Sequence, residues 1–321
     1  MRLFRVLHNR FFLPLKVLCR DVYYHNGTIG IYRFISTLFR GTSIGVSTEK
    51  KLNNKIIDKL GHEFHDLLAK YQDESYDVFY DSNAPIWVLW LQGYEKAPDI
   101  VKKCINSIKA STSHPVKLIS ANSISDYYDL PEYIMKKYAD GKISNAQFSD
   151  ILRMSLLSKY GGLWVDATIF IPKMIPEDIF KKEFYTCKRD IKDSGYVSEC
   201  RWTSFLIGCQ KGCVIQRAAK DLLFAYWKKY NYLIDYLLID YVLLLIYKQI
   251  PKAKCLIDDL SYNNPKIEEL QNRMNDAFDE RIYRTLITDS DTNFFKLSWR
   301  MNFETQTSDG KLTMFGFFMG I

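Results

Sequence analysis

A run of six apolar residues at 86–91, with the sequence IWVLWL, constrains the fold of this chain more than any other segment. It lies between Pro85 and the pair Gln92-Gly93, and its length with its β-branched and aromatic content is typical of a buried parallel strand. Two further apolar segments, at 115–120 and 163–171, have the same character, and helical segments separate the three. This alternation predicts an open α/β sheet of the βαβαβ type, in which ligands bind at the carboxyl ends of the strands.

The periodicity of apolar residues predicts helices between and around these strands. The helix at 145–160 is expected to end at Gly161-Gly162, because glycine is favoured just after a helix. The other predicted helices lie at 48–72, 98–109, 133–138, 214–230 and 233–250, and the other predicted strands at 184–187, 205–208, 294–299 and 312–318.

The positive charge of the chain is concentrated near its N-terminus. The first 50 residues contain eight basic and two acidic residues, so +6 of the total net charge of +7 lies there and the rest of the chain is nearly neutral. A nucleic-acid partner is therefore not expected, since such partners need a basic surface on the body of the protein.

Residues 1–46 are interpreted as a basic N-terminal helical arm, and residues 47–84 as a helical lead-in to the main domain. The apolar residues of the arm recur at helical spacing: Phe4, Leu7, Phe11, Leu15 and Leu18. This pattern favours a helix on an anionic membrane surface, and the alternative is a helix that packs on the body with its basic residues in solvent. Residues 41–45 (GTSIG) are expected to form a flexible linker after the arm.

The residues with the most informative chemistry flank the third predicted strand. Asp150 and Arg153 are three residues apart, so they share one face of the predicted helix. The following strand is expected to place Asp166 at its exposed end. One guanidinium and two carboxylates then converge at one edge of the sheet, where they suit a ligand with hydroxyl and phosphate groups. The alternatives are a surface ion pair and a polar strand end.

The sequence SDILR at 149–153, followed by YGGLWVDAT at 160–168, resembles the donor-site signature of sugar transferases with a D-x-D motif. These include glycosyltransferase family 32 and the glucosylating clostridial toxins, and the bacterial capsular polysaccharide synthesis family is most similar in wording. The resemblance implies an α/β fold of the GT-A type, a Rossmann-like open mixed sheet flanked by helices. It divides the domain at 85–321 into a nucleotide-sugar half, 85–173, and an acceptor half, 174–321.

The resemblance also implies roles for residues around the nucleotide. Trp90 would stack on the nucleobase, Leu91 and Gln92 would offer contacts beside it, and Asn122 would contact the base or the ribose.

Three residues would act at the transferred sugar if the resemblance holds. Asp150 would bind hydroxyls of the donor, and Arg153 would hold the sugar and stabilise the leaving diphosphate. Asp166, the first acid of the D-x-D, would bridge the ribose, the sugar and a metal ion.

The chain departs from the motif at Thr168, where relatives have a second acid that binds Mn²⁺ or Mg²⁺. Threonine is a poor ligand for a hard cation. Three outcomes stay open. The metal binds weakly through Asp166 and the diphosphate, another carboxylate binds it, or Arg153 and a lysine neutralise the leaving group without metal. Weak metal dependence is the favoured expectation.

Two further segments are candidates for binding. In the C-terminal segment Lys296, Ser298 and Trp299 would close over the diphosphate, or they would belong to a final edge strand. On the acceptor side the candidates are Trp202, Thr203, Ser204, Asp235 and Asp240. Both aspartates are placed on the helix at 233–250, where helix capping or solvation is the alternative to acceptor binding.

The expected function is that of a retaining glycosyltransferase with a nucleotide-sugar donor, a UDP-sugar, and a lipid-linked or oligosaccharide acceptor in bacterial surface polysaccharide synthesis. A cytoplasmic protein, peripheral on the inner face of the cell membrane, is expected because no apolar stretch is long enough to span a bilayer. The alternative is a non-catalytic protein of the same fold that acts as a scaffold for a membrane assembly complex.

Overall fold

The central sheet has five strands in the order β2-β1-β3-β6-β5. The computed structural model describes residues 13–24, 27–72, 77–191 and 196–321. In the sheet, β1 (Ile86–Leu89) is parallel to both β2 (Val116–Ile119) and β3 (Gly162–Val165). β6 (Leu206–Cys209) is antiparallel to β3 and to β5 (Phe184–Thr186). The predicted α/β class is confirmed, and this mixed sheet flanked by helices is consistent with the GT-A type.

The strand order places the crevice for a ligand beside β1. The chain passes from β1 outward to β2 and then returns to form β3 on the other side of β1. In open α/β sheets, such a reversal leaves a crevice at the carboxyl ends of the two strands that flank it. The residues that directly follow β1 and β3, Trp90 and Asp166, therefore border the same crevice.

The prediction of a single strand over residues 163–171 was wrong, because the segment forms two short strands separated by a turn. β3 ends at Val165, and a turn follows in which the amide of Ile169 donates to the carbonyl of Asp166 over 2.9 Å. β4 (Ile169–Phe170) then pairs with β7 (Phe295–Lys296) in a second, two-stranded sheet. An apolar run does not reveal such a turn, because the residues on both sides of it are buried.

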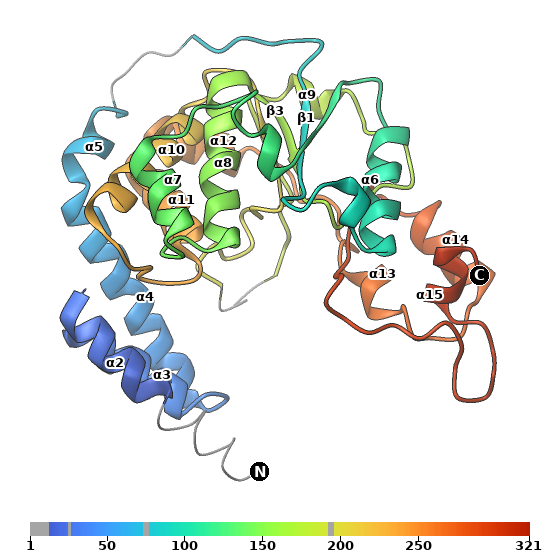
Figure 1. Ribbon diagram of the computed structural model, residues 1–321, viewed down its shortest axis with the longest axis horizontal. Helices are drawn as coiled ribbons and strands as arrows, with labels where there is room; N and C mark the ends of the chain where they lie inside the picture. Colours follow the sequence, from blue (N-terminus) through green and yellow to red (C-terminus); the bar gives the residue numbers. More distant parts are fainter. Residues whose placement is uncertain (1–12, 25–26, 73–76, 192–195) are drawn as a thin grey trace.

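Helices cover both faces of the sheet. Figure 1 shows α8, α10, α11 and α12 on one side of β1 and β3, and α6 on the other. The helices that follow the first strands and β6 are α6 (Asp99–Ala110), α7 (Glu132–Ala139), α8 (Asn145–Tyr160), α10 (Val214–Lys229), α11 (Leu238–Gln249) and α12 (Pro251–Asp258). The shorter ones are η2 (Tyr94–Lys96), η3 (Ala121–Ser123), α9 (Asp178–Lys181), α13 (Glu269–Asn272), α14 (Glu280–Ile287) and α15 (Met314–Met319).

The Gly161-Gly162 pair ends α8 as predicted, and both residues have positive φ angles. At Gly162, φ is +95° and a Cβ atom would lie 2.1 Å from the carbonyl oxygen of Pro85. Only glycine fits there. This close approach of Gly162 to Pro85 lets β3 lie directly beside β1. The Gly161-Gly162 pair is therefore needed for strand packing as well as for the end of α8.

The N-terminal region is a series of helices. α2 (Leu13–Tyr24) and α3 (Gly27–Leu38) form a hairpin that projects away from the sheet in Figure 1, and α4 (Ser43–Glu63) with α5 (His65–Ala69) connects it to the body. The predicted residues Phe4, Leu7 and Phe11 lie outside the described residues.

The flexible linker predicted at 41–45 was wrong. The side chain of Thr42 accepts a hydrogen bond from the amide of Gly45 over 3.2 Å and so caps α4. α4 therefore begins before the helix predicted at 48–72, and it crosses the expected border between arm and lead-in.

The C-terminal strand predicted at 312–318 was also wrong, because the segment forms α15. Thr313 caps this helix by accepting from the amide of Gly316 over 3.0 Å. A short apolar run has no clear period, so the cap decides the outcome. None of the helices in the described part of the chain is long and apolar enough to cross a membrane.

Candidate active site

A cleft of about 690 Å³ lies at the carboxyl ends of β1 and β3. Four segments line most of it: residues 89–92 after β1, the first turns of α8, residues 164–168, and residues 296–300 from the C-terminal part. The volume is in the range that holds small-molecule ligands. Residues 296–300, at and after β7, belong to the predicted acceptor half of the domain, yet they line the cleft together with residues of the predicted nucleotide-sugar half.

Arg153 is the centre of a charged cluster under this cleft. Its Nη1 donates to Asp150 Oδ1 over 2.5 Å, and its Nη2 donates to Asp166 Oδ1 over 3.4 Å. The guanidinium also lies over the ring of Trp164, 4.8 Å from its centre. The predicted convergence of one guanidinium and two carboxylates is therefore confirmed. Arg153 is only 4% exposed, so a surface ion pair is excluded.

Asp166 connects the buried cluster to the cleft. Its Oδ1 accepts a second hydrogen bond, from Trp164 Nε1 over 2.9 Å, which fixes the carboxylate. Its other oxygen, Oδ2, lies 3.8 Å from Lys296 Nζ, and 29% of the side chain is exposed. Asp166 can therefore contact a ligand directly, whereas Asp150 and Arg153 lie below the lining of the cleft.

Two buried carboxyls near Arg153 have raised pKa values. Burial raises the pKa of Asp150 to about 6, although Arg153 opposes this effect. Burial likewise raises the pKa of Asp240 to about 6, although Asp240 accepts a hydrogen bond from Trp202 Nε1 over 2.9 Å and is attracted by Arg153. Both groups therefore change protonation near pH 6.

Thr168 is bound to a lysine. Lys296 Nζ donates to Thr168 Oγ1, and the amide of Leu297 donates to the carbonyl of Thr168 over 2.9 Å. Among the described residues, no group of three or more acidic, histidine or cysteine side chains is arranged to hold a metal ion. Asp166 already accepts hydrogen bonds from Arg153 and Trp164 and faces the ammonium of Lys296. Asp166 and Thr168 therefore do not fit the oxygen ligands that a divalent metal ion needs.

Two tryptophans form one wall of the cleft. Trp90 and Trp299 meet edge to face with their ring centres 5.8 Å apart, and Trp299 is 45% exposed. The carbonyl of Leu91, beside Gln92, already accepts from the amide of Ala121 over 3.0 Å. The structure brings Trp90, Leu91 and Gln92 together with Ser298 and Trp299, as the sequence prediction required for one shared site.

Asn122 lies apart from these residues. It is exposed on η3, after the outer strand β2, and it is not part of the lining of the cleft. The carboxyl end of β2 is one strand further from the crevice than that of β1, which explains the separation.

The chain matches the family described as "Capsular polysaccharide synthesis protein" over residues 40–316. It belongs to this family. A curated relative, the O-glycosyltransferase braB of Annulohypoxylon truncatum, is 28% identical over 154 residues, which are 45% of this chain and 36% of that protein. The chain thus spans about a third of the length of that relative.

A solved structure, "PaToxG Glycosyltransferase", is similar at a TM-score of 0.38 and 16% identity. The similarity covers 68% of this chain and 84% of that chain. The fold class of this family member therefore rests on the sheet topology described above.

The predicted acceptor residues of this family member are placed differently from the donor residues. Trp202 and Thr203 are buried, and neither they nor Ser204 line the cleft. Trp202 donates to Asp240, and the amide of Thr203 donates to Thr186 Oγ1 over 3.0 Å. These residues support the core behind the cleft.

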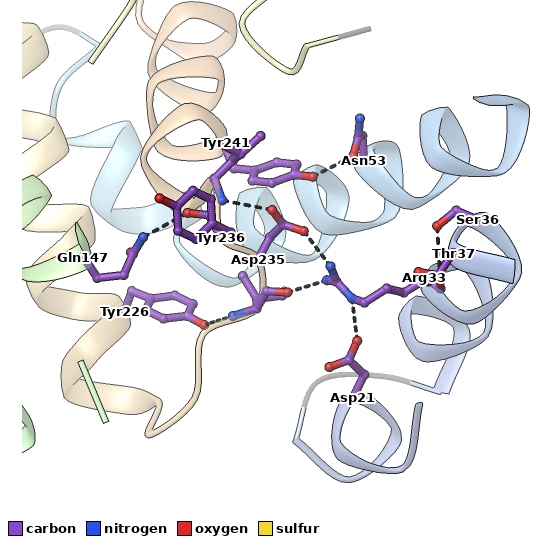
Figure 2. Close-up of polar contacts among 12 residues, drawn as sticks. Asp21, Arg33, Ser36, Thr37, Asn53, Gln147, Tyr226, Asp235, Tyr236 and Tyr241 are labelled. Carbon is purple, nitrogen blue, oxygen red and sulfur yellow. Dashed lines mark hydrogen bonds and ion pairs between the residues drawn. The ribbon is translucent and has the colours of Figure 1, made fainter. Parts of the chain in front are cut away.

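Asp235 precedes α11, so its predicted position on a helix was wrong. One carboxylate oxygen accepts from Arg33 Nη1 over 2.6 Å, and the other accepts from the amide of Leu237 over 2.9 Å (Figure 2). The carboxylate is thus committed to the N-terminal hairpin and to the turn before α11. This turn explains why the apolar run at 233–250 begins its helix late.

The structure adds cleft residues that the sequence did not indicate. They include Lys96, Asn145, Tyr236, Gln271 and Arg300. Tyr236 is held by its carbonyl, which accepts from Gln147 Nε2 over 3.0 Å (Figure 2). The sequence analysis selected the neighbouring Asp235, but Tyr236 is the residue that lines the cleft.

Proposed function

We propose that this protein is a retaining glycosyltransferase that moves a sugar from a UDP-sugar to a lipid-linked or oligosaccharide acceptor in the synthesis of a bacterial surface polysaccharide. The observation that carries the proposal is Arg153, held between Asp150 and Asp166 under the cleft at the reversal of strand order. Membership of the capsular polysaccharide synthesis family and the name of the O-glycosyltransferase relative support it.

The charges of the cleft suit the breaking of a glycosyl–diphosphate bond. This step leaves a nucleoside diphosphate and a sugar with positive charge at its anomeric carbon. Lys296 lines the cleft, and its ammonium is fixed by the Thr168 hydroxyl and lies beside Asp166, so it can stabilise the leaving diphosphate with little reorganisation. Arg153 lies below the cleft and fixes the Asp166 carboxylate. Asp166 is then placed for the sugar and ribose hydroxyls, and Trp90 for the base.

Retention requires that the acceptor hydroxyl attack from the face that the diphosphate leaves. Positioning of the two reactants can supply much of the rate enhancement of such a step. In this proposal the acceptor enters beside Tyr236, an exposed residue of the cleft lining.

We further propose that the N-terminal hairpin binds the anionic inner face of the cell membrane, where a lipid-linked acceptor is found. Apolar side chains on α2, α3, the turn after α3 and the start of α4 are exposed, namely Leu15, Val22, Ile31, Phe39 and Ile44. Apolar and basic residues together are typical of peripheral binding to such a surface.

The membrane proposal is tested with the full chain. The variant Val22→Glu/Ile31→Glu should lose co-sedimentation with vesicles of phosphatidylglycerol and phosphatidylcholine, because it places two acids on the exposed faces of the hairpin. Met174→Glu, a change at an exposed apolar residue far from the hairpin, is the control. Equal sedimentation of all three proteins would contradict the proposal.

The proposed activity is tested by the release of UDP from a panel of UDP-sugars. The wild-type protein should turn over at least one donor, and Asp166→Asn should lower that rate about 100-fold, since it removes a charge at the reacting sugar. Asp58→Asn, an exposed acid on α4, is the matched control. No turnover of any donor, or an unchanged rate in Asp166→Asn, would overturn the assignment.

A further inference from the structure

The two acid positions of the D-x-D motif hold Asp166 and Thr168 in this chain, and one lysine contacts both. Lys296 Nζ donates to Thr168 Oγ1 and lies 3.8 Å from Asp166 Oδ2. The lysine comes from β7, 128 residues after the threonine. An ammonium group therefore occupies the space between the two motif positions.

The backbone fixes this lysine in place. In the two-stranded sheet Lys296 is paired with Ile169, and its amide donates to the carbonyl of Ile267 over 2.7 Å. The ammonium lies 5.6 Å from the centre of the Phe205 ring. Lys296 is thus held on both its backbone and its side chain, while a quarter of the side chain stays exposed to the cleft.

A divalent cation would find few ligands at this position. Such ions need several oxygen ligands, usually with two or more carboxylates. Here Asp166 Oδ1 accepts from Arg153 and Trp164, and Oδ2 faces the ammonium. The threonine hydroxyl is neutral and accepts from the same lysine. The chemistry of these side chains suits a fixed organic cation better than a metal ion.

We propose that Lys296 supplies the positive charge that a metal ion supplies in enzymes with a complete D-x-D motif, so that turnover needs no divalent metal. This inference rests on the proposed function. The bond between the anomeric carbon and the diphosphate oxygen breaks, and its electron pair stays on that oxygen. The acceptor oxygen forms the new bond to the carbon, and its proton passes to the departing diphosphate. Lys296 holds the diphosphate throughout and exchanges no proton, while Arg153 fixes Asp166 from below the cleft.

The first test is chelation of the wild-type protein. After exhaustive treatment with EDTA, the turnover of a UDP-sugar should stay within about twofold, because the cation of the site is part of the chain. A loss of more than about tenfold that Mn²⁺ restores would overturn the inference.

The second test rebuilds the motif. Lys296→Ala should lower turnover about 100-fold, and Mn²⁺ should not restore it. In Lys296→Ala/Thr168→Asp, the second acid is present and the ammonium is absent, so Mn²⁺ should raise turnover at least about tenfold over the metal-free rate. Lys182→Ala, an exposed lysine remote from the cleft, is the control. Thermal unfolding of each variant confirms that it is folded.

A third readout does not depend on activity. Binding of Mn²⁺ to the free protein, followed by electron paramagnetic resonance, should be absent in the wild type and present in Lys296→Ala/Thr168→Asp. Binding of Mn²⁺ to the wild type that Asp166→Asn abolishes would overturn the inference. If the wild type neither binds UDP nor turns over a UDP-sugar, the proposed function fails. If it does both but requires Mn²⁺, only the inference about Lys296 fails.

Discussion

Arg153 and Arg33 are each held by two carboxylates, but they serve different parts of the molecule. The partners of Arg153 are 3 and 13 residues away along the chain, and the cluster lies under the cleft. The partners of Arg33 are 12 and 202 residues away, and the cluster joins the N-terminal hairpin to the turn before α11 (Figure 2). The same ion-pair chemistry thus forms a candidate active site in one region and a structural attachment in the other.

The surroundings of the two arginines explain the difference. Beside Arg153, Asp166 is partly exposed and can exchange contacts with a ligand. Beside Arg33, Asp21 is 0% exposed, and the third contact of the guanidinium is to the backbone carbonyl of Ile234. Arg33 also lies before residue 40, outside the part of the chain that matches the family. It is not available as a free cation for a membrane, contrary to what the charge of the arm suggested.

The largest effect is expected at the arginine under the cleft. Arg153→Lys keeps a positive charge beside Asp150 but loses the planar fork that reaches two partners at once. The rate of UDP-sugar turnover should fall about 100-fold, with a smaller loss in the free energy of unfolding measured in urea. A rate within threefold of the wild type would remove the distinction between the two clusters.

The next effect is on stability. Arg33→Met removes the guanidinium that pairs with the buried Asp21 and the partly exposed Asp235, so the free energy of unfolding should fall by about 3 kcal/mol. Turnover of the folded protein should change less than threefold. Arg40→Met removes an exposed positive charge from the same region and should change neither quantity. Equal stability of both variants would show that the Arg33 cluster does not attach the hairpin.

These two arginines also show how far the sequence could predict the structure. Asp150 and Arg153 lie within one helical turn, and the glycine pair after them marks where the next strand begins. Local spacing was therefore enough for the helix at 145–160, for the first two parallel strands, for the start of the third and for the central cluster.

The remaining contacts depend on segments that are far apart in the chain. The pairing of Lys296 with Thr168 requires the register of β7 against β4, and no periodicity specifies which strand a short apolar run will join. The contact between Arg33 and Asp235 requires the position of a hairpin relative to a turn 202 residues away. Turns and caps, as at Asp166 and Thr42, likewise override the apolar pattern on which the strand and linker predictions depended.

A smaller effect is expected at Asp240, which is attracted by Arg153 and repelled by Asp235. Burial raises the pKa of Asp240 to about 6, so the folded state binds a proton that the unfolded state has lost between pH 4 and 6. The contribution of this carboxyl to stability is therefore lost as the pH rises through that window. Asp240→Asn does not titrate, so its stability relative to the wild type should improve by about 2 kcal/mol from pH 4 to pH 7.

Urea unfolding of both proteins across this pH range measures the difference. The asparagine oxygen can still accept from Trp202, so the hydrogen bond is kept. A difference in stability that is constant with pH would mean that burial does not raise the pKa of Asp240 in the folded protein.

The smallest effect is expected at the wall of the cleft. Trp90→Phe keeps an aromatic face for the nucleobase, and UDP affinity should fall less than about threefold, whereas Trp90→Leu removes the face and should lower affinity about tenfold. Calorimetric titration with UDP measures both. Equal affinities for the wild type and Trp90→Leu would exclude stacking on this ring.

Titration of UDP into the wild type, Arg153→Lys and Arg33→Lys tests the central claim most directly, because it asks which of the two arginine clusters lies at a nucleotide site. We predict binding of one UDP per wild-type chain, at least tenfold weaker binding in Arg153→Lys, and binding within twofold of the wild type in Arg33→Lys. No binding to the wild type, or equal losses in the two variants, would contradict the account.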